Sequence, residues 1–184
     1  MDFHYETPRL NLNILQPTYQ NARKVLKFYQ DNALDFEAVE PKREHGFYTE
    51  SFQKNALTME YNLFLRQQNL RYWITKKDCP DRIIGTISFY HILYGAHNSC
   101  SVGYKIDAAY RHNGYANEAL TATIPMIFRE LGLHRVSAYV LPENEASIRL
   151  LNATGFQYEG TAKHFAKIND VWRDHLQYAK INDF

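Results

Sequence analysis

The fold of this chain is decided by a ten-residue stretch that reads Tyr110-Arg111-His112-Asn113-Gly114-Tyr115-Ala116-Asn117-Glu118-Ala119. It lies between a strand-like run over residues 101–106 and a helical pattern over residues 116–131. The first amide N–H groups of a helix have no internal partner, and the helix dipole adds partial positive charge to them. Gly114 lets the backbone approach a ligand closely, and Arg111 adds a formal positive charge. The stretch therefore predicts a turn that binds phosphate.

A purely structural interpretation of this turn stands beside the functional one. Asn-Gly is a common turn dipeptide, and strand–turn–helix connections are common in folds of every kind. The stretch is not a Walker loop, because it has no Gly-Lys-Ser/Thr at the required spacing. It is not a dinucleotide fingerprint either, because Gly114 is its only glycine.

Length and composition are typical of a globular protein. The 184 residues include 45% hydrophobic and 22% charged side chains, which favours a single domain over residues 1–184. A net charge of +1 argues against a nucleic-acid binder, and no apolar run is long enough to span a membrane. With no signal-peptide pattern and two cysteines, Cys79 and Cys100, we expect a cytoplasmic protein with free thiols. The eight histidines lack metal-ligand spacing, so no metal is expected.

Alternation of apolar and polar residues predicts a sheet of several short strands. The connections between the second, third and fourth of these strands are too short for crossovers, so the three form an antiparallel meander. Residues 78–81 supply its first turn, and Asn169-Asp170 turns a hairpin near the end of the chain. The expected strands cover residues 9–14, 71–76, 83–93, 99–107, 135–141, 156–167 and 171–181.

Segments with helical periodicity lie between several of these strands. We expect Asp31–Gly46 to be mostly loop, and Pro125 to kink or shorten the helix that contains it. Gly103, inside a strand, predicts a bulge or a close backbone approach. The expected helices lie around residues 22–29 and over residues 47–68, 116–131 and 144–155. In the second helix the expected inward side chains are Phe52, Ala56, Met59, Leu63 and Phe64.

Two stretches together resemble a known family. The first runs over residues 103–119, and the second over residues 144–156 and on to Glu159-Gly160. Their order and separation resemble the acetyl-CoA-binding core of the GNAT acetyltransferase superfamily. The Gly-Tyr pair in the strand, the Asn-x-x-Ser helix start and the late Gly-Phe look like the ribosomal-protein N-terminal (Rim-type) branch. Thr7-Pro8-Arg9-Leu10 and Trp172-Arg173-Asp174-His175 fit that branch as well.

The resemblance implies an α+β fold in αβα layers, with one mixed, mostly antiparallel twisted sheet of about seven strands and helices on both faces. Its fourth and fifth strands splay into a V that admits acetyl-CoA. The resemblance places the pantetheine arm on the backbone of Tyr104, Lys105 and Ile106. It assigns two further sets of residues to the cofactor. The pyrophosphate set is Arg111, His112, Asn113, Gly114, Tyr115 and Ala116, and the set at the start of the expected helix over residues 144–155 is Asn144 and Ser147.

The implied reaction is direct attack of an amine on the thioester, which needs donors for the oxyanion and a proton for the leaving thiolate. Many members carry a tyrosine seven residues after the asparagine, where this chain has Leu151. The branch instead offers Ser147 as the proton donor, although a hydroxyl at a helix start also serves the backbone or the cofactor alone. Ser101 occupies the position of a glutamate base, which leaves Glu118, expected to cap or pair in its helix, and His91.

The missing base bears on the acceptor. An α-amino group with a pKa of about 7.7–8.0 is roughly a tenth neutral at pH 7, whereas a lysine near 10.4 offers well under a thousandth. A site without a strong base therefore suits a protein N-terminal α-amine. A polyamine or antibiotic acceptor stays open, as does a catalytically silent acetyl-CoA sensor that has lost the chemistry. The expected partners are acetyl-CoA and an amine, bound by a monomer or homodimer.

Overall fold

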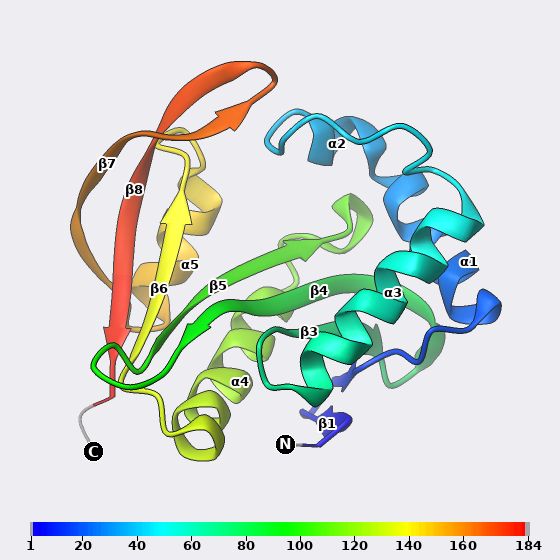
Figure 1. The fold of residues 1–184 in the computed structure, drawn as a ribbon, viewed down its shortest axis with the longest axis horizontal. Helices are drawn as coiled ribbons and strands as arrows, with labels where there is room; N and C mark the ends of the chain where they lie inside the picture. The colour runs from blue at the N-terminus through cyan, green and yellow to red at the C-terminus, as the bar shows by residue number, and fades with distance from the viewer. Residues whose placement is uncertain (1, 183–184) are drawn as a thin grey trace.

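The computed structural model describes residues 2–182, which build one eight-stranded mixed sheet between two layers of helices (Figure 1). The sheet order is β1-β2-β3-β4-β5-β6-β8-β7, and only the β5–β6 pair is parallel. The strands are β1 (His4–Glu6), β2 (Leu10–Asn13), β3 (Leu70–Lys76), β4 (Cys79–Leu93), β5 (Ser99–Ile106), β6 (Arg135–Val140), β7 (Gln157–Ile168) and β8 (Val171–Ile181). The helices are α1 (Tyr19–Asp31), α2 (Ala33–Glu37), α3 (Glu50–Leu65), the 3₁₀ turn η1 (Ala108–Tyr110), α4 (Tyr115–Leu131) and α5 (Glu145–Ala153).

The two faces of the sheet have different cores. Helices α1–α3 cover the front face, where an aromatic cluster packs around Trp73 of β3 and Phe28 of α1. Helices α4 and α5 cover the back face, where a larger aliphatic core forms around Leu120 of α4 and Ile87 of β4. Burial of these side chains, at roughly 25 cal/mol per Å² of apolar surface, holds the layers together. Within residues 2–182 no helix combines the length and apolarity that a membrane crossing requires.

Most of the expected elements are confirmed. β3, β4 and β5 form the antiparallel meander, and β7 and β8 form the terminal hairpin. Asn169 and Asp170 turn that hairpin with φ of 47° and 65°, values that suit short polar side chains. Asn144 caps α5, because its side-chain oxygen accepts a hydrogen bond from the Ser147 amide.

Three features differ from expectation: an additional strand, an additional helix and a shorter turn. The short strand β1 pairs with β2 and raises the strand count to eight. The segment expected to be mostly loop contains helix α2, whose Phe36 is buried in the front core. The turn expected over residues 78–81 is shorter, because β4 begins at Cys79. In each case tertiary pairing or burial overrides a weak local signal.

The inward face of α3 was predicted correctly at Phe64, which is buried, and wrongly at Met59. Met59, expected inward, is 62% exposed, whereas Gln53 and Leu57 are buried. The helix is rotated by about one residue, because its inward row includes two polar side chains that find partners. Gln53 donates to the Phe47 carbonyl and Glu60 pairs with Arg71 of β3. The pattern of apolar residues alone cannot identify an inward helix face that contains polar side chains with buried partners.

Helix α4 runs unbroken from Tyr115 to Leu131 with Pro125 inside it, so the helix is not shortened there, and the alternative of a kink stays a prediction. Pro125 lies on the exposed side, and the carbonyl of exposed Thr121, which it leaves without an amide partner, is open to water. Gly114 begins the helix at φ 77° and Gly132 ends it at φ 62°, left-handed conformations that glycine adopts without strain.

The sheet opens between β5 and β6. These strands pair only where Ser99–Ser101 lie beside Arg135–Ser137. From residue 102 to residue 106, β5 keeps its pairing with β4 but has no strand partner on the β6 side, and the two ribbons diverge (Figure 1). The expected V between the fourth and fifth predicted strands is therefore present, with its apex at Ser101 and Ser137.

Candidate active site

The phosphate-binding turn predicted from the sequence lies at the open end of the V. Strand β5 leads into η1, where the Asp107 carboxylate accepts a hydrogen bond from the Ala109 amide. The chain then turns through Gly114 into α4. Within residues 2–182 the amide N–H groups of residues 112–117 have no hydrogen-bond acceptor. Six free donors at the positive end of a 17-residue helix form a cradle for an anion.

Arg9 and Glu118 hold this cradle in shape. The Arg9 Nε lies 2.6 Å from a Glu118 carboxylate oxygen, and Arg9 Nη1 donates to the Asn113 carbonyl at 3.0 Å. Thr7 donates its hydroxyl to Glu118 at 2.6 Å. Burial raises the pKa of Glu118, but the hydrogen bonds from Thr7 and Arg9 outweigh this effect and hold the pKa below its usual value. Glu118 therefore pairs within the turn, as expected, and three hydrogen bonds together with a lowered pKa make its carboxylate a weak base.

The Arg111 side chain is engaged elsewhere. Its guanidinium forms an ion pair with Asp35 of α2 at 3.0 Å and lies 3.4 Å from the Ile106 carbonyl. His112 adopts φ 63° in the same turn and is exposed. The cradle is consequently built from backbone groups, and the Arg111 charge is partly neutralised by its partner.

Tyr104 and Ser147 bridge the V on the back face. The Tyr104 hydroxyl on β5 lies 2.6 Å from the Ser147 hydroxyl on α5. Burial raises the pKa of Tyr104 to about 12, although the hydrogen bond to Ser147 acts in the opposite direction. The Ser147 amide is fixed by the Asn144 cap at 3.1 Å. The two predicted site segments thus meet through their hydroxyl groups.

Lys105 points to the opposite, front face. Its Nζ lies 2.6 Å from a Glu40 carboxylate oxygen in the segment between α2 and α3. Burial lowers the pKa of Lys105, and the Glu40 carboxylate opposes that shift. Since neighbouring strand residues alternate between faces, the Tyr104 and Lys105 side chains leave the V lined by main chain.

The apex of the V carries hydroxyl groups and no carboxylate. Ser101 is buried, and its hydroxyl makes no hydrogen bond within residues 2–182. The Tyr90 ring of β4 lies over Gly103, 3.4 Å from where a side chain would begin. Gly103 itself pairs regularly with Ser88 and has only the Tyr90 side chain near it, so the bulge expected there is absent. The irregularity in the ladder lies on the partner strand, between Tyr90 and Leu93.

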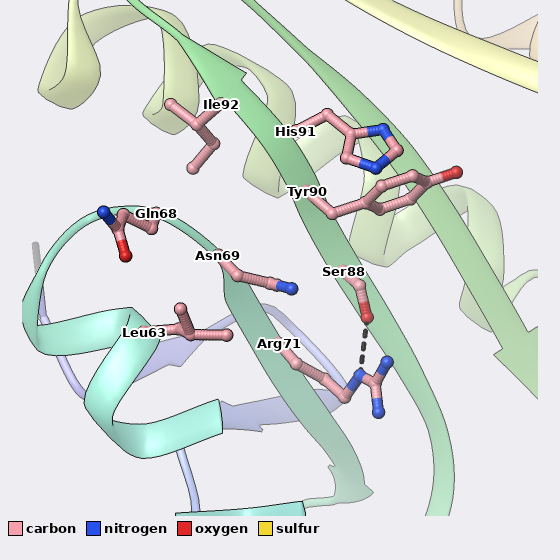
Figure 2. Close-up of a pocket in the computed structure, with 8 residues that line it drawn as sticks. All are labelled: Leu63, Gln68, Asn69, Arg71, Ser88, Tyr90, His91 and Ile92. Carbon is pink, nitrogen blue, oxygen red and sulfur yellow. Dashed lines mark hydrogen bonds between the residues drawn. The ribbon is translucent and has the colours of Figure 1, made fainter. Parts of the chain in front are cut away.

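His91 sits at that irregularity with φ 51°, a left-handed conformation that is rare for a histidine in a strand. Its ring contacts Tyr90 with centroids 4.9 Å apart. It lines a pocket of about 490 Å³ between the end of α3 and β4 (Figure 2). The lining residues are Leu63, Gln68, Asn69, Arg71, Ser88, Tyr90, His91 and Ile92.

A buried group of charges lies next to this pocket. Arg71 Nη1 pairs with Glu60 at 2.5 Å, and Arg71 Nε donates to Ser88 at 2.8 Å. Burial raises the pKa of Glu60 against the opposing effect of Arg71. The sequence does not indicate which partner each of these residues has, because Glu60 and Arg71 belong to different elements. The one available signal is that Glu60 is a polar residue on the inward face of a helix. Within residues 2–182 no three histidine, cysteine or carboxylate side chains group as metal ligands would.

Comparison with known proteins defines the class. Residues 9–157 match the model of the acetyltransferase (GNAT) domain, and the chain belongs to this family of acetyltransferases. Among its relatives are ribosomal-protein alanine N-acetyltransferases. The [ribosomal protein uS5]-alanine N-acetyltransferase of Escherichia coli (strain K12) is 31% identical over 157 residues, 85% of this chain and 80% of that protein.

Two further relatives agree. The probable N-acetyltransferase YjcK of Bacillus subtilis (strain 168) is 35% identical over 162 residues, 88% of this chain and 89% of its own. The crystal structure of the ribosomal-protein-S5-alanine acetyltransferase from Vibrio fischeri superposes with a TM-score of 0.92 at 31% identity, covering 99% of this chain and 98% of that one. The Rim-type resemblance and the fold class expected from the sequence are therefore confirmed.

Proposed function

We propose that this protein transfers the acetyl group of acetyl-CoA to the α-amine of a protein N-terminus. The observation that carries the proposal is the row of six unpaired amides over residues 112–117, placed at the mouth of a V whose inner edge is unpaired main chain. A diphosphate fits such a row of donors at a helix start, and an extended amide-containing arm fits a free strand edge. The relatives named as alanine acetyltransferases of ribosomal protein S5 support the choice of a protein acceptor.

The residues divide by the part of the cofactor that each would hold. The main chain of Tyr104, Lys105 and Ile106 would bond to the pantetheine arm, and the amides from Arg111 to Ala116 would bind the pyrophosphate. Asn144 would fix the start of α5 beside the arm through its cap to the Ser147 amide. We take residues 1–184 as one catalytic domain, and the two free thiols support a reducing, cytoplasmic setting.

The chemistry follows from what the apex offers. The acceptor nitrogen attacks the thioester carbonyl carbon, a new C–N bond forms, and the C–S bond breaks to release the CoA thiolate. Ser147 gives its proton to that thiolate and recovers one from Tyr104, which lies 2.6 Å away. The proton lost by the amine leaves through water, and water in turn reprotonates Tyr104, so that both hydroxyl groups are restored. A site without a carboxylate at Ser101 works on an amine that is already partly neutral, which favours an α-amine over a lysine.

Thiol release is the test. Acetyl-CoA should release CoA thiol when peptides with free N-termini are added, and mass spectrometry should place the acetyl group on the α-amine. The matched control is the same peptide with a blocked N-terminus and a free internal lysine. Acetylation of that lysine with none at N-termini would reverse the assignment. Saturable acetyl-CoA binding without turnover on any amine would indicate a catalytically silent sensor. That alternative is favoured by Leu151, a buried apolar residue at the position where many family members carry a tyrosine.

A further inference from the structure

A second hollow lies along the exposed face of α3, next to the pocket beside the apex. Its lining includes Leu63, which the two hollows share, and Arg66. The second hollow has a volume of about 460 Å³, within the usual range of ligand sites. The two hollows share Leu63 and are together called the α3 groove below; their lining residues extend from Ser88 and Tyr90 near the apex to Arg66 at the end of the helix.

The α3 groove contains cations and neutral polar groups, and neither hollow has a carboxylate in its lining. Arg71 and Arg66 are its charged residues, while amides, hydroxyls and a histidine supply the rest of its polarity. Arg71 Nε and Nη1 are engaged by Ser88 and Glu60, but Nη2 has no acceptor within residues 2–182. The Arg71 side chain is 28% exposed and lines the first hollow, and Nη2 is not among the fully buried atoms that lack a partner.

The charges behind the groove do not reverse its sign. Three cations, Arg71, Lys105 and Arg43, face two carboxylates, Glu60 and Glu40, beneath the segment between α2 and α3. Their side chains are 28% exposed or less, so solvent screens them only in part. The net charge of these five side chains is +1, and Glu37, which lies near Arg43 through the Tyr48 hydroxyl, brings the total to zero. The excess positive charge of the groove therefore comes from Arg66, which forms no ion pair within residues 2–182, and it repels a polycation and attracts an anion.

Register fixes how far the groove lies from the reacting centre. Arg71 pairs with Ser88, and Ser88 pairs with Gly103 beside the apex. Adjacent strands are about 4.8 Å apart, so the Arg71 backbone lies about two strand spacings from Gly103. An extended peptide advances about 3.3 Å per residue, so an acceptor amine at the apex would place residues two to four of its chain in the groove.

We infer that the α3 groove binds residues two to four of an acceptor polypeptide and selects acidic side chains there, with Arg71 and Arg66 as the specificity-determining residues. The inference rests on the proposed function. It excludes polyamines and aminoglycosides as preferred acceptors, because their several ammonium groups would meet two arginines and no carboxylate.

The experiment uses peptides that differ only at residues two to four, which are all Glu, all Gln or all Lys. For the unmodified protein we expect kcat/KM to fall from the Glu to the Gln peptide and again to the Lys peptide, by about tenfold at each step. Spermidine and an aminoglycoside should be poorer acceptors than the Gln peptide. The preference should weaken at high salt, since charge attraction is screened.

Variants locate the effect. Arg66→Gln should lessen the preference for Glu, and Arg71→Gln combined with Glu60→Gln should nearly abolish it without leaving a buried carboxylate unpaired. Arg129→Gln removes an exposed charge from α4, on the back face, and serves as the matched control that keeps the Glu preference. Circular dichroism and the melting temperature confirm that each variant is folded. If the double variant is unfolded, Arg66→Gln and the salt dependence of the Glu preference test the inference in its place.

The outcomes separate the two proposals. Equal or better turnover of the Lys peptide, with the Gln peptide still acetylated, overturns the charge selection and leaves the proposed function intact. Turnover of spermidine or the aminoglycoside without turnover of any peptide overturns both the peptide acceptor and this inference. Absence of thiol release with every amine overturns the proposed function, and the inference falls with it.

Discussion

The hydroxyl oxygens of Tyr104 and Ser147 lie 2.6 Å apart and connect β5 to α5 across a V that the sheet itself leaves open. This contact joins the two segments whose motifs carry the family resemblance. It also gives Ser147 a neighbour from which a donated proton can be replaced. The contact is part of a site whose other half, the anion cradle, consists of main chain.

Ser147→Ala and Tyr104→Phe separate proton donation from binding. Each should lower kcat by at least about a hundredfold, the lower range for loss of a general acid, while leaving the acetyl-CoA Kd nearly unchanged. Steady-state kinetics and calorimetric titration of CoA measure the two quantities. A loss of affinity without a loss of kcat would mark Ser147 as a cofactor-binding residue only.

Gly114→Glu should abolish acetyl-CoA binding, because it places bulk and negative charge where the pyrophosphate would lie. Gly114→Ala is the control for backbone strain. At φ 77° any side chain costs about 1 kcal/mol, and the nearest atom to the new Cβ is Arg9 Nη2 at 3.5 Å. The alanine variant should therefore be modestly less stable and should still bind. Equal binding by wild type and Gly114→Glu would contradict the cradle.

Glu118→Gln tests the clamp on the cradle. Losing the charged partner of Arg9 should lower the free energy of unfolding by about 1–2 kcal/mol and weaken acetyl-CoA binding. Because the folded pKa of Glu118 lies below its ordinary value of 4.5, its contribution is present above pH 4.5 and is lost as pH falls through the folded pKa. The stability difference between wild type and Glu118→Gln, measured by urea unfolding, should shrink in acid. A difference that stays constant with pH would show that the charge of Glu118 contributes nothing.

Arg71 and Glu60 form a buried pair whose loss is strongly non-additive. Arg71→Met should cost about 3 kcal/mol, because it leaves the Glu60 carboxylate buried without its partner. The double variant Arg71→Met with Glu60→Met should cost less than either single change, since it leaves no uncompensated charge. A denaturant-based double-mutant cycle measures the coupling. Additive effects would argue that the pair is solvated in the folded protein.

Local patterns predicted the elements that have strong periodicity or a strong cap. The meander, the hairpin at Asn169, the α5 cap at Asn144 and both glycine ends of α4 follow from residues within a few positions of one another. The same patterns failed for α3, where Glu60 faces inward. They also missed β1, which is three residues long and forms only by pairing with β2.

The class of fold, the family and the position of the helix start with free amides could be predicted from residue order alone, because these depend on local propensity and on short motifs. What those motifs face could not be predicted in this way, because it depends on contacts between distant elements. The Tyr104–Ser147 contact, the Arg9–Glu118 clamp and the Arg71–Glu60 pair each join different elements, and the latter two involve charges whose partners no local pattern specifies. The charge of the α3 groove follows from these pairings, because a charged residue acts on a ligand only to the extent that its neighbours leave it unpaired.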